Sequence, residues 1–260
     1  MKMRTFCIVI AILLSLFNSA FIQVANASEI KSTSNIQFNE ITQMALEDIH
    51  HIEIRNGTTG EFVIVKSSKL LEDIYTAFSN ATYKIKTDER KSGGWSYAVS
   101  FFASGMNTPL AKYAFPSGIS VNNVIYILDE AEDIHNLIKN IYDLSNIKVT
   151  YAEKYFDFSQ VPPYLDNNSR VMVPLRSFCE TINASVQWLD KTKEIVIVKD
   201  GITINFAINS DTYYVDKSMR KMDTTPVIIN DRTYIPVRYI AEAFNMKVSL
   251  DGKTRTVSLY

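Results

Sequence analysis

One motif occurs twice near the C-terminus, and this repeat limits the possible folds more than any other feature of the sequence. The first copy runs over residues 170–180 and the second over residues 232–242, so equivalent residues lie 62 positions apart. The match continues without a gap to the last residue, Tyr260. We therefore expect two copies of one supersecondary unit, at about residues 147–199 and about residues 200–260.

Each copy has the pattern of a strand that leads into a short helix and then a hairpin. Pro174 and Pro236 follow short apolar strands, and proline suits the first helical position because no backbone N–H is needed there. Asn183 and Asn245 stand where a helix is expected to end on a left-handed residue. The pattern predicts a β-rich α+β domain made of two such units.

Two charged residues recur one helical turn apart in each copy. Arg176 lies four residues before Glu180, and Arg238 lies four residues before Glu242. Residues at this spacing are neighbours on a helix surface, so we expect an ion pair that orients each helix on its sheet. The alternative is that these side chains bind an anionic polymer.

The repeated motif resembles the copper amine oxidase N-terminal domain family, also called the stalk domain. The family pattern is a Val-Pro-Leu-Arg segment, a glutamate four residues after the arginine, and then a Val-x-Trp strand. Residues 147–260 carry it at Pro174, Arg176, Glu180 and Trp188, and again at Pro236, Arg238 and Glu242, where Leu250 replaces the tryptophan. The resemblance implies a stalk-type domain common in exported proteins of Gram-positive bacteria. It implies no catalysis, because copper and the tyrosine-derived quinone of amine oxidases belong to a separate domain.

The histidines of the chain do not suit a copper centre. Imidazole is a good copper ligand, but the sequence has 3 histidines and none lies in the repeat. His50 and His51 are adjacent on a predicted strand, so we expect their rings to point to opposite faces and not to chelate one metal together. The sequence has no nucleophile-elbow motif and no zinc-ligand spacing. It predicts no catalytic residue, no metal, no cofactor and no enzymatic activity.

Residues 41–146 alternate between strand-like and helix-like patterns. A hairpin, a helix, several short strands and a closing helix predict a separate α+β domain, with two helices on a five- or six-stranded antiparallel meander. Trp95, Tyr97 and Phe101 alternate onto one face of the clearest strand. We expect this face to be the core beneath the helices; the alternative is an exposed aromatic strip that binds sugars.

The N-terminus has the order of a secretory signal peptide. Two basic residues precede an apolar run, and the run is followed by Ala25-Asn26-Ala27, which is a small-x-small cleavage site. We expect residues 1–27 to be removed and residues 28–40 to form a polar linker. The alternative is an uncleaved anchor, because some apolar residues continue past the main run.

Signal cleavage also sets the charge and the cysteine content. It would remove two of the 27 basic residues and none of the 28 acidic residues, so the remaining chain has no charge excess that attracts nucleic acid. No further apolar run is long enough to span a membrane. Cys179 is then the single cysteine, so no internal disulfide can form, and we expect this thiol to be buried.

These features predict an exported, secreted protein, associated with the cell wall, that acts by binding or scaffolding. Its expected partners are a cell-wall polymer or another envelope protein. One alternative is an accessory protein whose N-terminal module binds wall polysaccharide for a hydrolase acting in trans. Another is a hydrolase that uses carboxylates alone. An exposed aromatic strip would favour sugar binding, whereas a buried one would favour protein–protein scaffolding.

Overall fold

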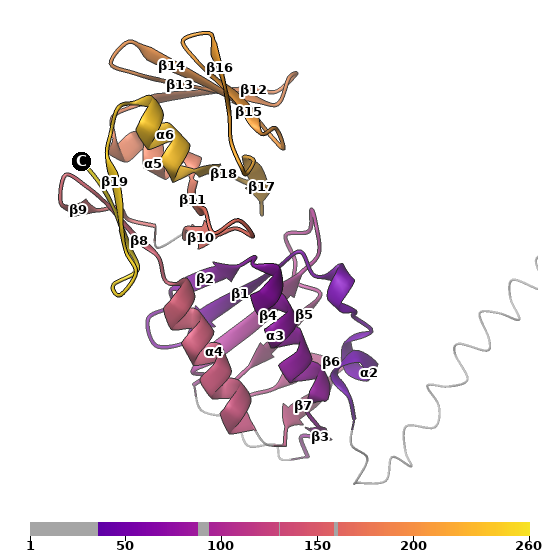
Figure 1. Ribbon diagram of the computed structural model, residues 1–260. Helices are drawn as coiled ribbons and strands as arrows, with labels where there is room; N and C mark the ends of the chain where they lie inside the picture. Colours follow the sequence, from indigo (N-terminus) through magenta and orange to yellow (C-terminus); the bar gives the residue numbers. More distant parts are fainter. Residues whose placement is uncertain (1–35, 88–93, 130, 159–160) are drawn as a thin grey trace, which may run out of the picture. The chain divides into compact units, whose positions relative to one another are not determined.

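The computed structural model describes residues 36–87, 94–129, 131–158 and 161–260 (Figure 1). They all belong to one compact unit, Ile36–Tyr260. The expected signal peptide and the first residues of the expected linker lie outside the described residues. The described residues are a mixture of helices and mainly antiparallel sheets, which agrees with the predicted α+β class.

The first described element lies where a polar linker is expected. The short helix α2 spans Phe38–Thr42, and the 3₁₀ helix η2 spans Leu46–Asp48. Phe38 is fully buried, with its ring centroid 5.4 Å from that of Phe78 and 5.3 Å from that of Phe101. The linker prediction is therefore wrong for residues 36–40, because one aromatic side chain anchors an otherwise polar segment in the core.

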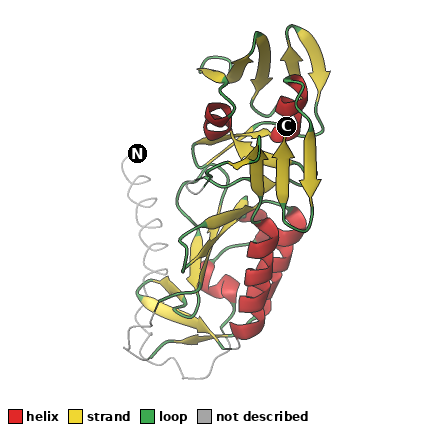
Figure 2. Ribbon diagram, turned by 90° about the vertical axis from the view of Figure 1, so that its left-hand side faces the viewer, coloured by secondary structure: helices red, strands yellow, loops and turns green. Residues whose placement is uncertain are grey.

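A four-stranded antiparallel sheet and two long helices form the centre of the first half. The sheet has the order β2-β1-β4-β5, with β1 His51–Asn56, β2 Phe62–Val65, β4 Tyr97–Phe102 and β5 Ala111–Ala114. Helices α3, Ser68–Asn80, and α4, Ala131–Ser145, lie side by side across one face of this sheet (Figures 1 and 2). Their apolar stripes meet the sheet in one cluster of buried side chains.

The remaining strands of this half form a second, smaller sheet. It has the order β3-β7-β6, with β3 Tyr83–Ile85, β6 Ile119–Val121 and β7 Val124–Leu128. The expected single meander is therefore wrong. Strand β4 pairs with β1, which is distant in the sequence, instead of with its predecessor β3. Single-strand patterns carry no information about such a choice of partner.

At the centre of the C-terminal half, two strands from the two copies of the motif pair with each other. The sheet has the order β10-β11-β18-β17, with β10 Tyr164–Leu165, β11 Val171–Pro174, β17 Val227–Ile229 and β18 Arg232–Pro236. The register between β11 and β18 places Met172 opposite Pro236 and Pro174 opposite Tyr234. Since 172 and 234 differ by 62, as do 174 and 236, exchanging the two copies maps one pair onto the other.

Each of these two central strands continues into a short helix. Helix α5 spans Leu175–Thr181 and helix α6 spans Val237–Ala243. Pro174 and Pro236 are extended residues that cap the helices, one position earlier than predicted. Asn183 and Asn245 adopt φ angles of 56° and 58°, so the predicted left-handed ends are confirmed.

Two outer sheets mix strands from early and late parts of this half. One has the order β12-β13-β14-β15-β16, with β12 Ser185–Leu189, β13 Glu194–Lys199, β14 Ile202–Ala207, β15 Thr212–Val215 and β16 Ser218–Lys221. The other has the order β19-β20-β8-β9, with β8 Lys148–Tyr151, β9 Lys154–Tyr155, β19 Val248–Asp251 and β20 Thr256–Leu259. The last strand, β20, pairs in parallel with β8.

Side chains from all three sheets and from both short helices share one core. The ring of Phe156 stacks on that of Phe178 in α5, with centroids 5.3 Å apart and an 8° angle between the planes. Cys179 is fully buried beside it, as predicted for this thiol. Among the described residues, no helix combines the length and the apolar character needed to cross a membrane.

Candidate functional site

The predicted ion pair is present in one copy of the motif only. In α6, the Nε atom of Arg238 lies 3.6 Å from Oε1 of Glu242, and the two side chains are 53% and 52% exposed. In α5, the exposed Arg176 side chain makes no ion pair and no hydrogen bond with any described residue, Glu180 included. An exposed pair of this kind contributes little to stability, so it does not hold the helix on its sheet.

The aromatic strip predicted on β4 is not exposed. Tyr97 and Phe101 are buried, and Trp95 is half-buried. The ring of Tyr97 packs 5.5 Å from that of Tyr142 in α4, and Phe101 packs 5.5 Å from Phe78 in α3. Tyr97 and Phe101 therefore line the core under the two helices, and these two side chains offer no open platform for a sugar ring.

His50 and His51 lie next to each other, and the prediction that they point to opposite faces is wrong. Their Nδ1 atoms are 3.2 Å apart. The reason is that β1 begins at His51, so His50 precedes the strand and does not follow its alternation. Burial and the nearby positive charges lower the pKa of His51 to about 3. The described residues contain no group of three ligands that would hold a metal.

A serine–histidine contact in the first half has no signal in the sequence. Ser96 Oγ lies 2.8 Å from Nε2 of His135, which belongs to α4. The two residues are 39 positions apart, and no motif surrounds either of them. The imidazole ring packs edge-on against Tyr97 and Phe115, at 5.6 and 5.4 Å between centroids. Among the described residues, no carboxylate bonds to the imidazole to orient it as a general base.

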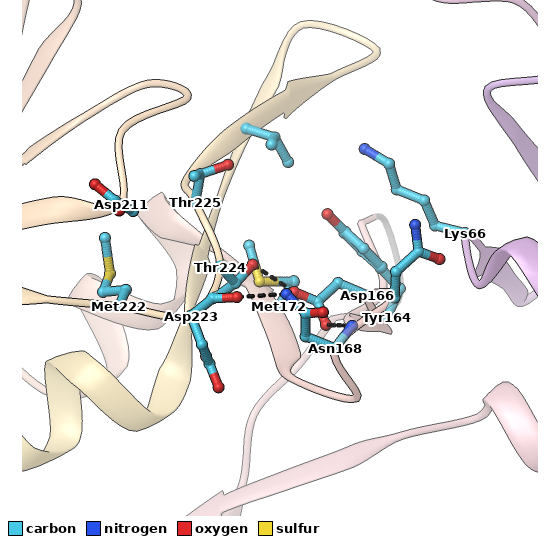
Figure 3. Close-up of a pocket in the computed structure, with 12 residues that line it drawn as sticks. Lys66, Tyr164, Asp166, Asn168, Met172, Asp211, Met222, Asp223, Thr224 and Thr225 are labelled. Carbon is cyan, nitrogen blue, oxygen red and sulfur yellow. Dashed lines mark hydrogen bonds between the residues drawn. The ribbon is translucent and has the colours of Figure 1, made fainter.

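One cavity of about 490 Å³ is lined in part by the hairpin that β10 and β11 form (Figure 3). Asp166 is central to it: its Oδ1 atom accepts hydrogen bonds from the backbone N–H groups of Asn168 (2.9 Å) and Arg170 (2.8 Å). The hydroxyl of Thr224 donates to its other oxygen. Lys66 also lines this cavity, and burial lowers the pKa of its ammonium group.

The neighbouring Asp223 is also occupied. The Nε atom of Arg170 donates to both of its carboxylate oxygens at 3.0 Å, and the hydroxyl of Tyr239 donates at 2.7 Å. These donors lower the pKa of Asp223 to about 2. Because the carboxylates of this cavity are already bonded within the chain, the cluster joins the two copies of the motif and leaves few free groups for a ligand.

A second cavity of about 460 Å³ opens between the edge strands β12 and β17, and we call it the β12–β17 groove. Val186 and Trp188 line it from β12, Ile228 from β17 and Leu175 from α5. Val186 is 36% exposed and Ile228 is 42% exposed, although both side chains are aliphatic. The groove thus exposes apolar side chains to solvent. Its lining is Val161, Pro174, Leu175, Arg176, Ser177, Val186, Trp188, Ile228, Asp231, Arg232 and Thr233.

Two exposed arginines, Arg176 and Arg232, line this groove. Neither Arg176 nor Arg232 forms an ion pair or a side-chain hydrogen bond with any described residue. Their counterparts in the other copy of the motif, Arg238 and Arg170, are each paired with a carboxylate. The two copies therefore differ in one respect that matters for binding: both guanidinium groups of the β12–β17 groove lack a partner among the described residues, whereas their counterparts are paired.

Comparisons with known proteins agree with the sequence motifs. Residues 150–259 match the family model of the copper amine oxidase N-terminal domain, which is the non-catalytic domain of those enzymes. A protein of Brevibacillus choshinensis named protease inhibitor is 29% identical over 87 residues, which cover 34% of this chain and 27% of that protein. The match thus spans about a quarter of that relative's length. The match over residues 150–259 confirms the resemblance found in the motifs.

Proposed function

We propose that this chain is an exported, non-catalytic protein of the cell envelope that works by binding or scaffolding. In this proposal residues 1–27 are a signal peptide and residues 41–146 form an α+β domain. Residues 147–260 form a stalk-type domain of two repeats, at about 147–199 and 200–260. The mature protein is secreted and associates with the cell wall through another envelope component.

The observation that carries the proposal is the β12–β17 groove. It combines exposed aliphatic side chains with two guanidinium groups that no described residue neutralises. An open apolar surface rimmed by charge is typical of a place where a partner docks. The groove lies within the family-matched part of the chain, whose family is non-catalytic. Binding is therefore the activity that this surface supports best.

The division into two repeats has its own support. Strands β11 and β18 pair with a register that exchanges the two copies of the motif. The cores of the two copies are also joined, because buried side chains of both α5 and α6 belong to one cluster.

Fractionation of a culture that expresses the native gene tests the proposal. We expect the mature chain to begin at Ser28 and to be retained on purified cell envelopes. The matched variants are Arg176→Ala, which removes one of the two guanidinium groups from the groove, and Arg238→Ala, which removes the equivalent guanidinium group from the other copy. We expect reduced retention for the first and normal retention for the second. Absence of the wild-type protein from the envelope fraction would refute the proposal.

A second candidate function follows from the Brevibacillus relative, whose name is protease inhibitor. In this case the partner of the groove would be a secreted protease. Measuring the residual activity of a panel of serine and metalloproteases with excess protein tests it, and undiminished activity of every protease would argue against it. The buried positions of Tyr97 and Phe101 weaken the polysaccharide-binding alternative, which depended on an exposed aromatic strip at these residues.

A further inference from the structure

We infer that the β12–β17 groove binds an extended peptide segment of another protein, one that carries an acidic residue beside an aliphatic residue. This inference rests on the proposed binding function and names the chemical class of its partner. Three features of the groove carry it: its free positive charge, its aliphatic lining and an open sheet edge.

The positive charge of the groove favours a partner that carries a negative charge. Arg176 and Arg232 come from different copies of the motif, yet they line one cavity and have no carboxylate partner among the described residues. The nearby carboxylate of Asp231 accepts a hydrogen bond from the side chain of Asn107. Guanidinium groups bind carboxylates by paired, charge-assisted hydrogen bonds, so an acidic side chain fits between them.

The side chains that line the groove suit a peptide better than a sugar or a phosphate polymer. Val161, Leu175, Val186 and Ile228 give the groove aliphatic walls, with Trp188 as its aromatic residue. Sugar rings prefer open aromatic faces, and anionic wall polymers have no apolar side chains to fill such walls. A Val, Ile or Leu side chain of a bound peptide would bury this exposed surface.

The edge of β17 offers main-chain hydrogen bonds. Asn230 and Asp231 form a two-residue turn with φ angles of 48° and 58°, and Ile229 and Arg232 flank it as a pair. The flanking pair of such a hairpin exchanges hydrogen bonds, so the next pair, Ile228 with Thr233, does not. The N–H and C=O groups of Ile228 therefore point away from β18, where an added strand can pair with them.

Selection from a random ten-residue peptide library displayed on phage, against the full mature protein, tests the inference. We expect the selected peptides to share an acidic residue next to an aliphatic one. For a synthetic peptide of that consensus, Arg176→Ala and Arg232→Ala should each weaken the affinity about tenfold, as expected for loss of a charge-assisted hydrogen bond. Arg238→Ala is the matched control and should leave the affinity unchanged.

Several outcomes would overturn the inference. They are a failed selection, a consensus without an acidic residue, equal weakening by Arg238→Ala, or tighter binding of purified teichoic acid than of the peptide. Circular dichroism confirms that each variant is folded, which we expect because both groove arginines are exposed. If the wild type and the Arg176→Ala variant are retained equally on envelopes, the inference fails while the proposed function stands.

Discussion

Val173 and Ile235 face each other across strands β11 and β18, and they hold the same place in the two copies of the repeated motif. Both side chains are fully buried in the core that the two copies share. The pairs on either side of them interchange when the copies are exchanged, so a local two-fold axis passes through this contact. The centre of the C-terminal half is therefore a contact between the copies.

Shortening Ile235 should destabilise the protein strongly. Ile235→Ala leaves a cavity at the contact between the copies, and we expect the free energy of unfolding to fall by about 2–5 kcal/mol. Denaturation by urea, monitored by circular dichroism, measures the change. Ile228→Ala is the control, because this side chain is largely exposed and its loss should cost much less. Equal losses for the two variants would show that Ile235 is not part of a tightly packed core.

The mixing of strands predicts how the C-terminal half responds to cutting. Strand β13 pairs with β14, and β20 pairs with β8, so each outer sheet contains strands from both proposed repeats. We expect residues 147–260 to fold as an isolated fragment and residues 147–199 or 200–260 not to fold alone. Thermal unfolding of the three fragments measures this. A cooperative transition in either short fragment would contradict the shared core.

Much of this fold could be predicted from local patterns, and the failures have physical causes. The hairpin β1–β2, both long helices and the left-handed ends at Asn183 and Asn245 depend on residues close in sequence, so their patterns are visible. The pairing of β4 with β1 and of β20 with β8 depends on contacts between distant segments. Phe38 was missed because one buried aromatic residue in a polar segment has no periodicity.

The candidate site could be predicted only in part. The repeat identified Arg176 and Arg238 as equivalent residues, but both helices gave the same spacing to a glutamate. Whether each arginine is paired depends on side-chain conformation and on surrounding strands, which the spacing does not contain. The role of Arg232 in the same groove depends on the antiparallel pairing of β11 with β18.

The exposed ion pair in α6 predicts a small effect on stability. Arg238 and Glu242 are each about half exposed, and exposed helix pairs contribute about 0.3–0.5 kcal/mol. We expect Arg238→Ala to change the free energy of unfolding by no more than about 0.5 kcal/mol and to reduce the salt dependence of stability. A loss of several kcal/mol would show that this arginine has a structural role that its exposure does not reveal.

The thiol of Cys179 should be protected in the folded protein. It is fully buried, and burial raises its pKa to about 12, so the reactive thiolate is scarce and inaccessible at neutral pH. For a chain that lacks residues 1–27, in which Cys179 is the single cysteine, we expect no modification by an aromatic disulfide reagent at pH 8 and one modified thiol per chain in denaturant. Rapid modification of the folded protein would show that α5 opens easily.

The buried His51 predicts a loss of stability in mild acid. Its ring stacks on Phe102 with centroids 4.7 Å apart, and it is 1% exposed. Burial is the largest reason that its pKa lies at about 3, below the ordinary 6.5, and the charges of His50 and Lys66 add to it. A lowered pKa means that the unfolded chain takes up a proton as the pH falls through 6.5, while the folded chain does not. The stability is therefore present above pH 6.5 and is lost below it.

The size of this loss follows from the two pKa values. Between pH 7.5 and pH 5, we expect the free energy of unfolding to fall by about 2 kcal/mol. The neighbouring Glu53 changes the stability in the opposite direction. Burial raises the pKa of its carboxyl group, so in stronger acid the folded chain takes up this proton before the unfolded chain does. His51→Phe keeps a ring against Phe102 and removes the titrating group. Urea denaturation at both pH values should show a smaller loss in this variant, with the remainder due to His50, whose pKa burial also lowers. A loss of the same size in the variant would assign the pH dependence to another group.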